Sequence, residues 1–286
     1  MAGKNERQRR QARERHRRQQ EQRVLRQQRV RRRWAIGTLA VLVAAGVGTL
    51  LLVFLPGGSA KKTSASASKS PSATPSATTV AEPAHHCSYA SATPVAKKVS
   101  FPPATPDYTN SYQATLNTNQ GKITFNLLNN KATCTVNSFV HLAEAGYFNN
   151  TQCHRLLTSG IYVLQCGDPY ATATAKLDCS ATGKIGSGTP GYDFASENLT
   201  GAKYPAGTVA MANEGSATTN GSQFFIVFKD STSGLTASYT PFATVSSGLG
   251  IVQNVAKDGY SCQYAQAGGG APKKKVIIDS VTIKKT

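Results

Sequence analysis

The chain has 286 residues, with 32 Lys and Arg against 14 Asp and Glu, and a formal net charge of +18 at pH 7. Residues 1–33 hold 14 basic and 3 acidic residues, a net +11, while the other 253 residues hold 18 and 11, a net +7. The strong positive charge therefore belongs mainly to the terminal segment, and the chain is not uniformly basic. Such a segment can bind nucleic acid or anionic lipid, and the sequence that follows it decides between them.

Residues 34–55 form an uncharged run of 22 residues that starts at Trp34. As a helix it is roughly 33 Å long, enough for a hydrocarbon core of about 30 Å. It predicts a single-pass helix in the cell membrane, with the basic tail in the cytoplasm against anionic lipids and the rest of the chain outside. No nucleic acid partner is then needed. A cleaved signal peptide, cut near residues 60–68, is the alternative.

Residues 56–106 are rich in Ser, Ala, Thr, Pro and Lys. So little apolar surface predicts a disordered linker that holds the next domain away from the membrane. Residues 107–286 are then the folded domain, a length that suits one core.

Six cysteines lie on the predicted outer side of the membrane, where disulfides persist. They are Cys87, Cys134, Cys153, Cys166, Cys179 and Cys262. Because no CxxC pair is present, a zinc site is not expected. Six cysteines allow 15 pairings, which the sequence does not resolve; Cys153 and Cys166 flank a predicted hairpin and can meet across it.

The predicted elements of the domain are mostly short strands. Residues 112–128 alternate around the turn TNQG and predict two strands, and residues 134–148 carry apolar residues at helical spacing. Thr133 or Thr135 can cap that helix and Gly146 can end it. Further strands are predicted over 154–157, 161–167, 207–213, 222–228, 241–247 and 275–283, and a second helix over 248–259. Many short strands with two helices favour a closed antiparallel barrel.

Arg155 is the one arginine that follows residue 33. The rest of the domain uses lysine for positive charge, so a retained guanidinium suggests a task that needs a planar, permanently charged group of donors. It lies between apolar runs in CHRLLTSGIYVLQCGDP, where burying a cation is costly unless it has a specific role.

The strings HR (154–155), LQCGDP (164–169), GTPGY (188–192), MAN (211–213) and TNGSQFFI (219–226) occur in this order. Together they make the domain resemble the cyclophilin-type peptidyl-prolyl cis-trans isomerases. The resemblance implies a mainly β fold: a closed eight-stranded antiparallel barrel, capped by two helices, with a groove on one outer face. It also implies catalysis without a metal or cofactor. The layout of basic tail, span and linker is similar to membrane-anchored cyclophilins of actinobacteria.

The resemblance assigns Arg155 as the catalytic arginine and Gln165 as the glutamine that steadies it. The residues it assigns to peptide and proline binding are Tyr162, Val163, Ala212, Asn213, Gln223, Phe224, Leu235, Tyr239 and Phe242. His154 is interpreted as structural, because isomerisation requires no proton transfer. Since side chains alternate along a strand, Phe224 and Phe225 must face opposite ways, one toward the groove and one toward the core.

The chain departs from the family pattern at several points. Two extra residues lie between Arg155 and Gln165, so the Tyr162 assignment can slip by one to Ile161. Tyr239 replaces a common histidine. Gly234 stands where the family has a tryptophan that contacts cyclosporin-type ligands, so weak cyclosporin binding is expected.

The expected function is isomerisation of X–Pro bonds in exported proteins by a monomer that binds proline-containing polypeptides. A binding or chaperone module that holds proline segments without turnover is the alternative, and retention of both Arg155 and Gln165 favours the enzyme.

Overall fold

The computed structural model describes residues 86–177, 179, 184–264 and 268–286, which belong to one compact unit, Ala77–Thr286. The predicted basic tail, the predicted membrane span and most of the predicted linker lie outside the described residues. Within these ranges no helix has both the length and the apolar character needed to cross a membrane.

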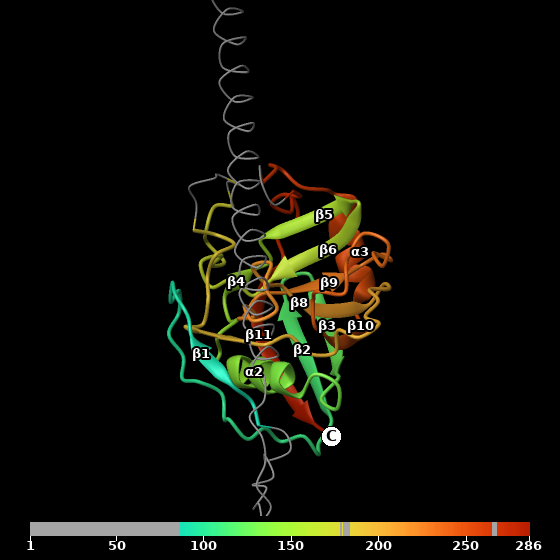
Figure 1. Ribbon diagram of the computed structural model, residues 1–286. Coiled ribbons are helices and arrows are strands. Elements are labelled where there is room, and N and C mark those ends of the chain that lie inside the picture. Colours follow the sequence, from blue (N-terminus) through green and yellow to red (C-terminus); the bar gives the residue numbers. More distant parts are fainter. Residues whose placement is uncertain (1–85, 178, 180–183, 265–267) are drawn as a thin grey trace, which may run out of the picture. The chain divides into compact units, whose positions relative to one another are not determined.

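Nine strands of the described residues form one curled antiparallel sheet (Figure 1). They are β2 (Tyr112–Thr118), β3 (Gly121–Leu127), β4 (Thr151–Gln152), β5 (Arg155–Ser159), β6 (Ile161–Cys166), β8 (Thr208–Met211), β9 (Phe224–Val227), β10 (Pro241–Ser247) and β11 (Ile277–Lys285). Their order across the sheet is β4-β11-β2-β3-β10-β8-β9-β6-β5.

The sheet has nine strands, one more than the eight expected, because the backbone around Cys153 changes its pairing partner. β4 pairs with β11, and β5 pairs with β6. Between them the Cys153 N–H donates to the Val276 carbonyl at 2.9 Å, and the His154 N–H donates to the Gln165 carbonyl at 3.0 Å. The two ends of the sheet therefore lie on one stretch of backbone. This change of partner divides the stretch into two strands and curls the sheet.

Two helices of the described residues cover the sheet, α2 (Thr133–Glu144) and α3 (Leu249–Lys257), close to their predicted positions. Phe139 of α2 meets an aromatic group at the centre of the core. Its ring centroid lies 5.3 Å from that of Phe148, 5.6 Å from Phe224 and 5.2 Å from Phe242. α3 buries Val252 and Val255 in the same core.

The start of α2 is capped by a residue that is distant in the sequence. No side chain of the N-cap residue, Ala132, forms a capping bond. The Glu197 carboxylate instead accepts the N–H of Cys134 at 3.1 Å, and the N–H and hydroxyl of Thr135, both at 2.7 Å. An acidic group satisfies unpaired donors at a helix N-terminus and interacts favourably with the helix dipole. The predicted threonine cap is therefore wrong, while Gly146, at φ +61°, does follow the end of the helix.

The predicted linker is too long at its carboxyl end. β1 (Tyr89–Ser91) pairs with β7 (Tyr192–Phe194), and Cys87 is disulfide-bonded to Cys134. The Tyr89 hydroxyl donates to the Cys134 carbonyl at 2.9 Å. The strand pairing, the disulfide and the Tyr89 side chain supply the attachment that the average composition of residues 86–106 does not suggest, so these residues lie on the domain.

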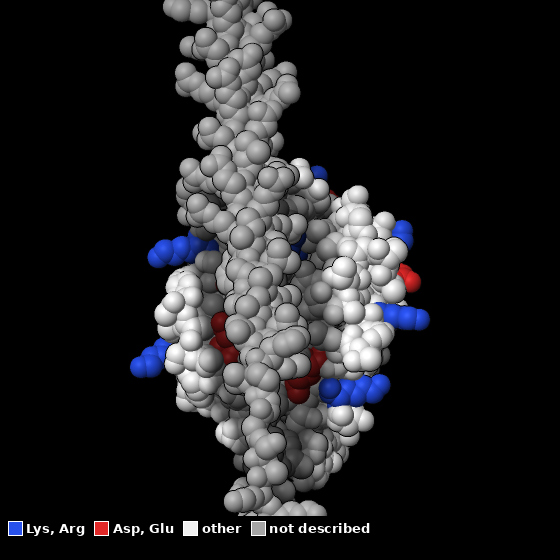
Figure 2. Space-filling view, viewed as in Figure 1, with Lys and Arg blue, Asp and Glu red and all other residues white. Residues whose placement is uncertain are grey.

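Three disulfides form among the described residues, Cys87–Cys134, Cys153–Cys166 and Cys179–Cys262. The predicted pairing of Cys153 with Cys166 is confirmed. On the face in Figure 2, the basic side chains of the described residues stand at separate points rather than as one patch.

Candidate active site

Arg155 stands in a row of residues that face one side of the sheet. The strand register pairs Arg155 of β5 with Gln165 of β6, Gln165 with Phe225 of β9, and Phe225 with Ala210 of β8. Directly paired residues of neighbouring strands point to the same face, so these four side chains lie together. Two residues further along the strands, a second row on this face contains Leu157, Val163 and Val227.

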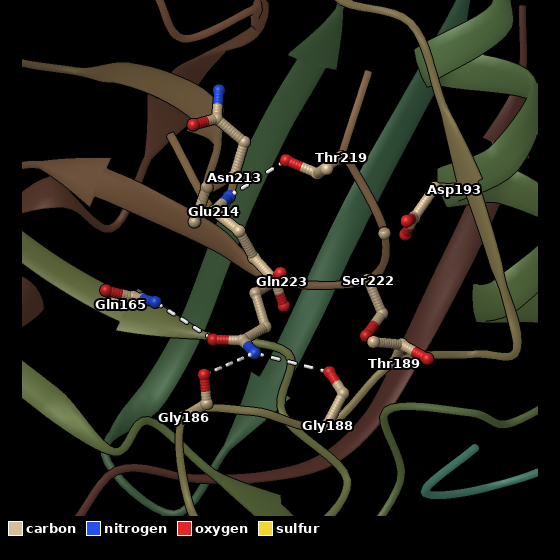
Figure 3. A pocket seen from close by; sticks show the side chains of 12 residues that line it. Gln165, Gly186, Gly188, Thr189, Asp193, Asn213, Glu214, Thr219, Ser222 and Gln223 are labelled. Atoms are coloured by element: carbon tan, nitrogen blue, oxygen red, sulfur yellow. Dashed lines mark hydrogen bonds between the residues drawn. The ribbon is translucent and has the colours of Figure 1, made fainter. Parts of the chain in front are cut away.

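The polar members of this face form one hydrogen-bonded series, which we call the Arg155–Gln165–Gln223 network. Arg155 Nη1 donates to Gln165 Oε1 at 3.0 Å, and Gln165 Nε2 donates to Gln223 Oε1 at 2.9 Å. Gln223 Nε2 then donates to the carbonyls of Gly186 at 3.1 Å and Gly188 at 3.2 Å (Figure 3). Because a guanidinium can only donate, its bond sets the orientation of both amides in turn.

A second acceptor holds the guanidinium from another direction. Arg155 Nε donates to the carbonyl of Gly268 at 3.0 Å. Burial lowers the pKa of Arg155, and the nearby Tyr239 and Tyr264 oppose that shift. An arginine keeps its charge despite such a shift. The result is a half-buried cation whose plane is held at Nε and at Nη1.

An apolar surface adjoins the cation, and we call it the second cluster because it is separate from the main core. Its buried members are Leu157, Val163, Tyr204, Ala210, Phe225 and Val227, with Ile161, Ala202, Ala212, Leu235 and Tyr239 packed against them. The rings of Phe225 and Tyr239 meet edge to face at 5.5 Å. Tyr239 is held in turn by Tyr204, whose hydroxyl donates to the Tyr239 carbonyl at 2.8 Å.

Phe224, which the sequence analysis assigns to the binding groove, does not lie on the face of Arg155, and Phe225 lies there instead. Phe224 has no exposed surface and lies in the main core, 5.8 Å from the ring of Phe148. Phe225 lies in the second cluster, beside Gln165 in the strand register. Alternation does separate the two rings, as expected. The residue that selects between them is Gln165, because the ring paired with it must share its face.

Two further groove assignments are corrected on the same physical ground. Phe242 is fully buried in the main core, where α2 covers it. Tyr162 packs against the main core, its ring 6.0 Å from that of Phe228, and Lys229 Nζ lies 4.5 Å from the Tyr162 ring centroid. Ile161 shares the face of Val163, two residues along β6, and packs on the second cluster. Ile161, the alternative given by a one-residue slip, is therefore the residue that lies on this face, and Tyr162 is not.

The remaining predicted residues do adjoin this face. The Ala212 N–H donates to the Gln223 carbonyl at 2.9 Å, and Asn213 Nδ2 donates to the Ser238 carbonyl at 2.8 Å. Leu235 and Tyr239 contact the second cluster. The structure thus brings Arg155, Gln165, Val163, Ala212, Asn213, Gln223, Leu235 and Tyr239 to one region, and places Tyr162, Phe224 and Phe242 elsewhere.

Beside the network lies a small pocket of about 70 Å³, whose acidic part the sequence does not predict. Gln165, Gln223 and Asn213 line one part of it, and the carboxylates of Asp193 and Glu214 line another (Figure 3). Burial raises the pKa of Asp193, and the neighbouring Glu214 adds to that rise. Among the described residues neither carboxylate forms an ion pair, so the pocket has a negative character.

His154, next to the cation, is only 1% exposed, and neither of its ring nitrogens has a hydrogen-bond partner among the described residues. Burial and then the charge of Arg155 lower its pKa to about 3. The imidazole is therefore neutral at pH 7 and turned into the protein, which agrees with its interpretation as a structural residue.

The functional contacts that sequence reasoning misses are mainly backbone groups. The carbonyls of Gly186, Gly188 and Gly268 hold the two ends of the network, and a carbonyl leaves no trace in residue identity. The run Gly268–Gly270 is the signal that was available, since consecutive glycines often mark a close backbone approach.

Comparison with known proteins places the chain in a family. The family model described as "Cyclophilin type peptidyl-prolyl cis-trans isomerase/CLD" matches residues 113–283. The "Probable peptidyl-prolyl cis-trans isomerase B" of Mycobacterium leprae is 42% identical over 206 residues, which are 66% of this chain and 61% of that protein. The protein of the same name from Mycobacterium tuberculosis is 43% identical over 183 residues, 58% of this chain and 52% of that protein.

A crystal structure of a cyclophilin type peptidyl-prolyl cis-trans isomerase from Cryptosporidium parvum superposes with a TM-score of 0.50 at 25% identity. The superposition covers 62% of this chain and 99% of that one. The chain spans between half and two thirds of the length of the two mycobacterial relatives.

Proposed function

The chain belongs to the cyclophilin-type peptidyl-prolyl cis-trans isomerase family, and we propose that it isomerises X–Pro bonds at the face formed by Arg155 and the second cluster. The observation that carries the proposal is the pair of anchors on one guanidinium, Gln165 at Nη1 and Gly268 at Nε, both at 3.0 Å. They hold a cation in a fixed plane beside an apolar surface that suits a proline ring.

The chemistry needs a donor that acts on the twisted amide. An X–Pro bond crosses a barrier of about 20 kcal/mol and takes tens of seconds unaided. When the amide twists, its nitrogen regains a lone pair that the planar amide delocalises. A donor aimed at that nitrogen is bound more strongly in the transition state than in the ground state, and only such a difference accelerates the step. Arg155 supplies the donor from a position that costs no reorganisation.

The apolar part of the site holds the proline while the preceding carbonyl rotates. Val163, Phe225 and Leu235 offer a surface for the ring, and Tyr239 closes it against Phe225. The Gln223 side chain and the backbone at Asn213 lie where the neighbouring peptide can be bound. Fixing the proline and its neighbour reduces the entropy that the rotation would otherwise cost.

The proposed clients are exported proteins, and the proposed location is the outer side of the cell membrane, with the basic tail on anionic lipids. The uncharged run at residues 34–55 and the three disulfides of the described residues support this placement, since disulfides persist outside the cytoplasm. We also propose that the protein works as a monomer.

The test is an isomerase assay on an Ala-Pro peptide, by protease coupling or NMR exchange, with the wild-type chain and with Arg155→Ala and Arg155→Lys. We expect at least a tenfold loss of turnover in both variants with an unchanged thermal midpoint, because lysine lacks the two-point attachment. Equal turnover in the variants would remove the role of Arg155. Peptide binding without turnover in the wild type would favour the alternative, a non-catalytic binding module.

A further inference from the structure

A segment near the carboxyl end lies along β5. It forms hydrogen bonds with three consecutive residues, His154 just before β5 and then Arg155 and Leu156 of β5. We call its described residues, 262–264 and 268–271, the clamp segment. Tyr264 Oη donates to the His154 carbonyl at 3.2 Å, and the Gly268 carbonyl accepts Arg155 Nε at 3.0 Å. The next residue, Leu156, exchanges two backbone bonds with Gly270, at 2.8 and 3.0 Å.

Glycine is required for this approach. Gly268 and Gly269 have φ of +67° and +63°, in the left-handed region that glycine adopts without strain. A Cβ at Gly269 would overlap the Leu156 carbonyl oxygen, and a Cβ at Gly270 would overlap the Cys262 carbonyl oxygen. The three glycines therefore let the backbone of the clamp segment reach hydrogen-bonding distance of β5.

The clamp segment is tied to a second loop by the Cys179–Cys262 disulfide. The Ala271 N–H also points at Cys179 Sγ, at 3.4 Å. Gly186 lies seven residues after Cys179, and the carbonyls of Gly186 and Gly188 accept the two hydrogen bonds of Gln223 Nε2. The disulfide thus joins two loops, of which one holds the Arg155 end of the network and the other holds the Gln223 end.

We propose that the Cys179–Cys262 disulfide and the clamp segment are positioning elements that fix the plane of the Arg155 guanidinium for catalysis. This inference rests on the proposed function. Loss of the bond at Nε would hold the guanidinium plane less firmly, and a long side chain gains rotamer freedom when such a bond is released. The second anchor at Nε comes from the Gly268 carbonyl, whose position depends on the clamp segment.

The experiment compares two disulfide deletions in the full-length chain. Cys179→Ala/Cys262→Ala removes the tie to the clamp segment, and the control, Cys87→Ala/Cys134→Ala, removes a disulfide that holds β1 to α2. We expect the first to lower kcat by about fivefold with KM within about twofold of wild type, because misplacing a catalytic group acts on the transition state. The control should keep kcat within about twofold. An unchanged kcat in the first variant, or an equal loss in both, would overturn the inference.

A second variant decides the matter if the disulfide deletion fails to fold. Tyr264→Phe removes the hydroxyl that bonds the His154 carbonyl and keeps the ring; we expect kcat to fall about fourfold, beyond the twofold margin of the control. In the Arg155→Ala background, neither Tyr264→Phe nor the disulfide deletion should lower the residual turnover further, because both act through the guanidinium. A full additional loss in that background would contradict the inference.

In the same variants, the attachment of the guanidinium can also be measured without an activity assay. Arg155 is the one arginine among residues 34–286, and the 13 others lie in residues 1–33. Its Nε–H donates to Gly268 and should give a separate NMR signal in slow exchange with water. The disulfide deletion should accelerate that exchange at least tenfold, and the control should not. A wild-type chain without isomerase activity would refute the proposed function instead, while the exchange measurement would still test the positioning.

Discussion

Replacing Gln165 by Leu tests whether the network sets the rate. The side chain is 8% exposed and bonds two partners, Arg155 at 3.0 Å and Gln223 at 2.9 Å. Leucine nearly keeps the volume and removes both bonds. A hydrogen bond to a charged group contributes about 1.5–3 kcal/mol, and a neutral one about 0.5–1.5 kcal/mol. The charged bond is the one that acts on catalysis, since it orients the guanidinium.

The expected loss of kcat depends on the hydrogen bond that Arg155 keeps in the variant. Gly268 still holds Nε, so only part of the orientation is lost. If the lost bond stabilises the transition state by about 1.4 kcal/mol, kcat falls about tenfold, because each 1.36 kcal/mol is a factor of ten in rate. KM should change less, since the surface that binds the proline ring is intact.

The assay is turnover of an Ala-Pro peptide, with thermal unfolding of the same samples. The matched control is Gln152→Leu, because Gln152 is also a buried glutamine, donating to the carbonyls of Thr172 at 2.7 Å and Ala175 at 2.8 Å. It should lose stability and keep kcat. A folded Gln165→Leu protein with wild-type kcat would refute the reasoning.

Four further outcomes are expected. Phe225→Ala should raise KM for proline peptides and cost less unfolding free energy than Phe224→Ala, which should lose about 3–5 kcal/mol by denaturant titration because it leaves a cavity in the main core. The folded-state pKa of His154, about 3, lies below its ordinary 6.5, so the neutral form stabilises the fold above pH 6.5, and that contribution is lost as the pH falls toward 3. Unfolding measured between pH 7 and 5 should show a drop of about 2 kcal/mol that a His154→Phe variant lacks, and parallel curves would count against it. Cyclosporin should bind weakly in a titration, since Gly234 cannot supply the contact of the family's tryptophan, and a side chain there would collide with Gly160 and Ile161; a nanomolar dissociation constant would show otherwise. A peptide with Lys two or three residues from the proline should have a KM roughly threefold below its Glu counterpart, and Glu214→Lys should abolish that preference in the same assay.

Where sequence reasoning failed, it lacked the partner across the strand or across the fold. The choice between Phe224 and Phe225 could not be made within β9, whose four residues are all buried. It depended on the register with β6. The assignment of Tyr162, with Ile161 as its alternative, likewise depended on the pairing of β6 with β5 and β9, which places Val163.

The cap of α2 and the extent of the domain show the same limit. The local sequence offers Thr133 and Thr135 as caps, but Glu197, more than 60 residues away, occupies the position. The attachment of residues 86–106 depends on a disulfide and on Tyr89, and neither raises the average hydrophobicity of the segment enough to register.

The sequence by itself determined the family, the strands and helices, and the importance of one guanidinium, because motifs, periodicity and a solitary arginine are properties of residue identity and spacing. The tertiary structure decided which face each strand residue serves and what holds Arg155 in place. Register and backbone carbonyls settle those questions, and both arise only when segments far apart in the chain come within hydrogen-bonding distance.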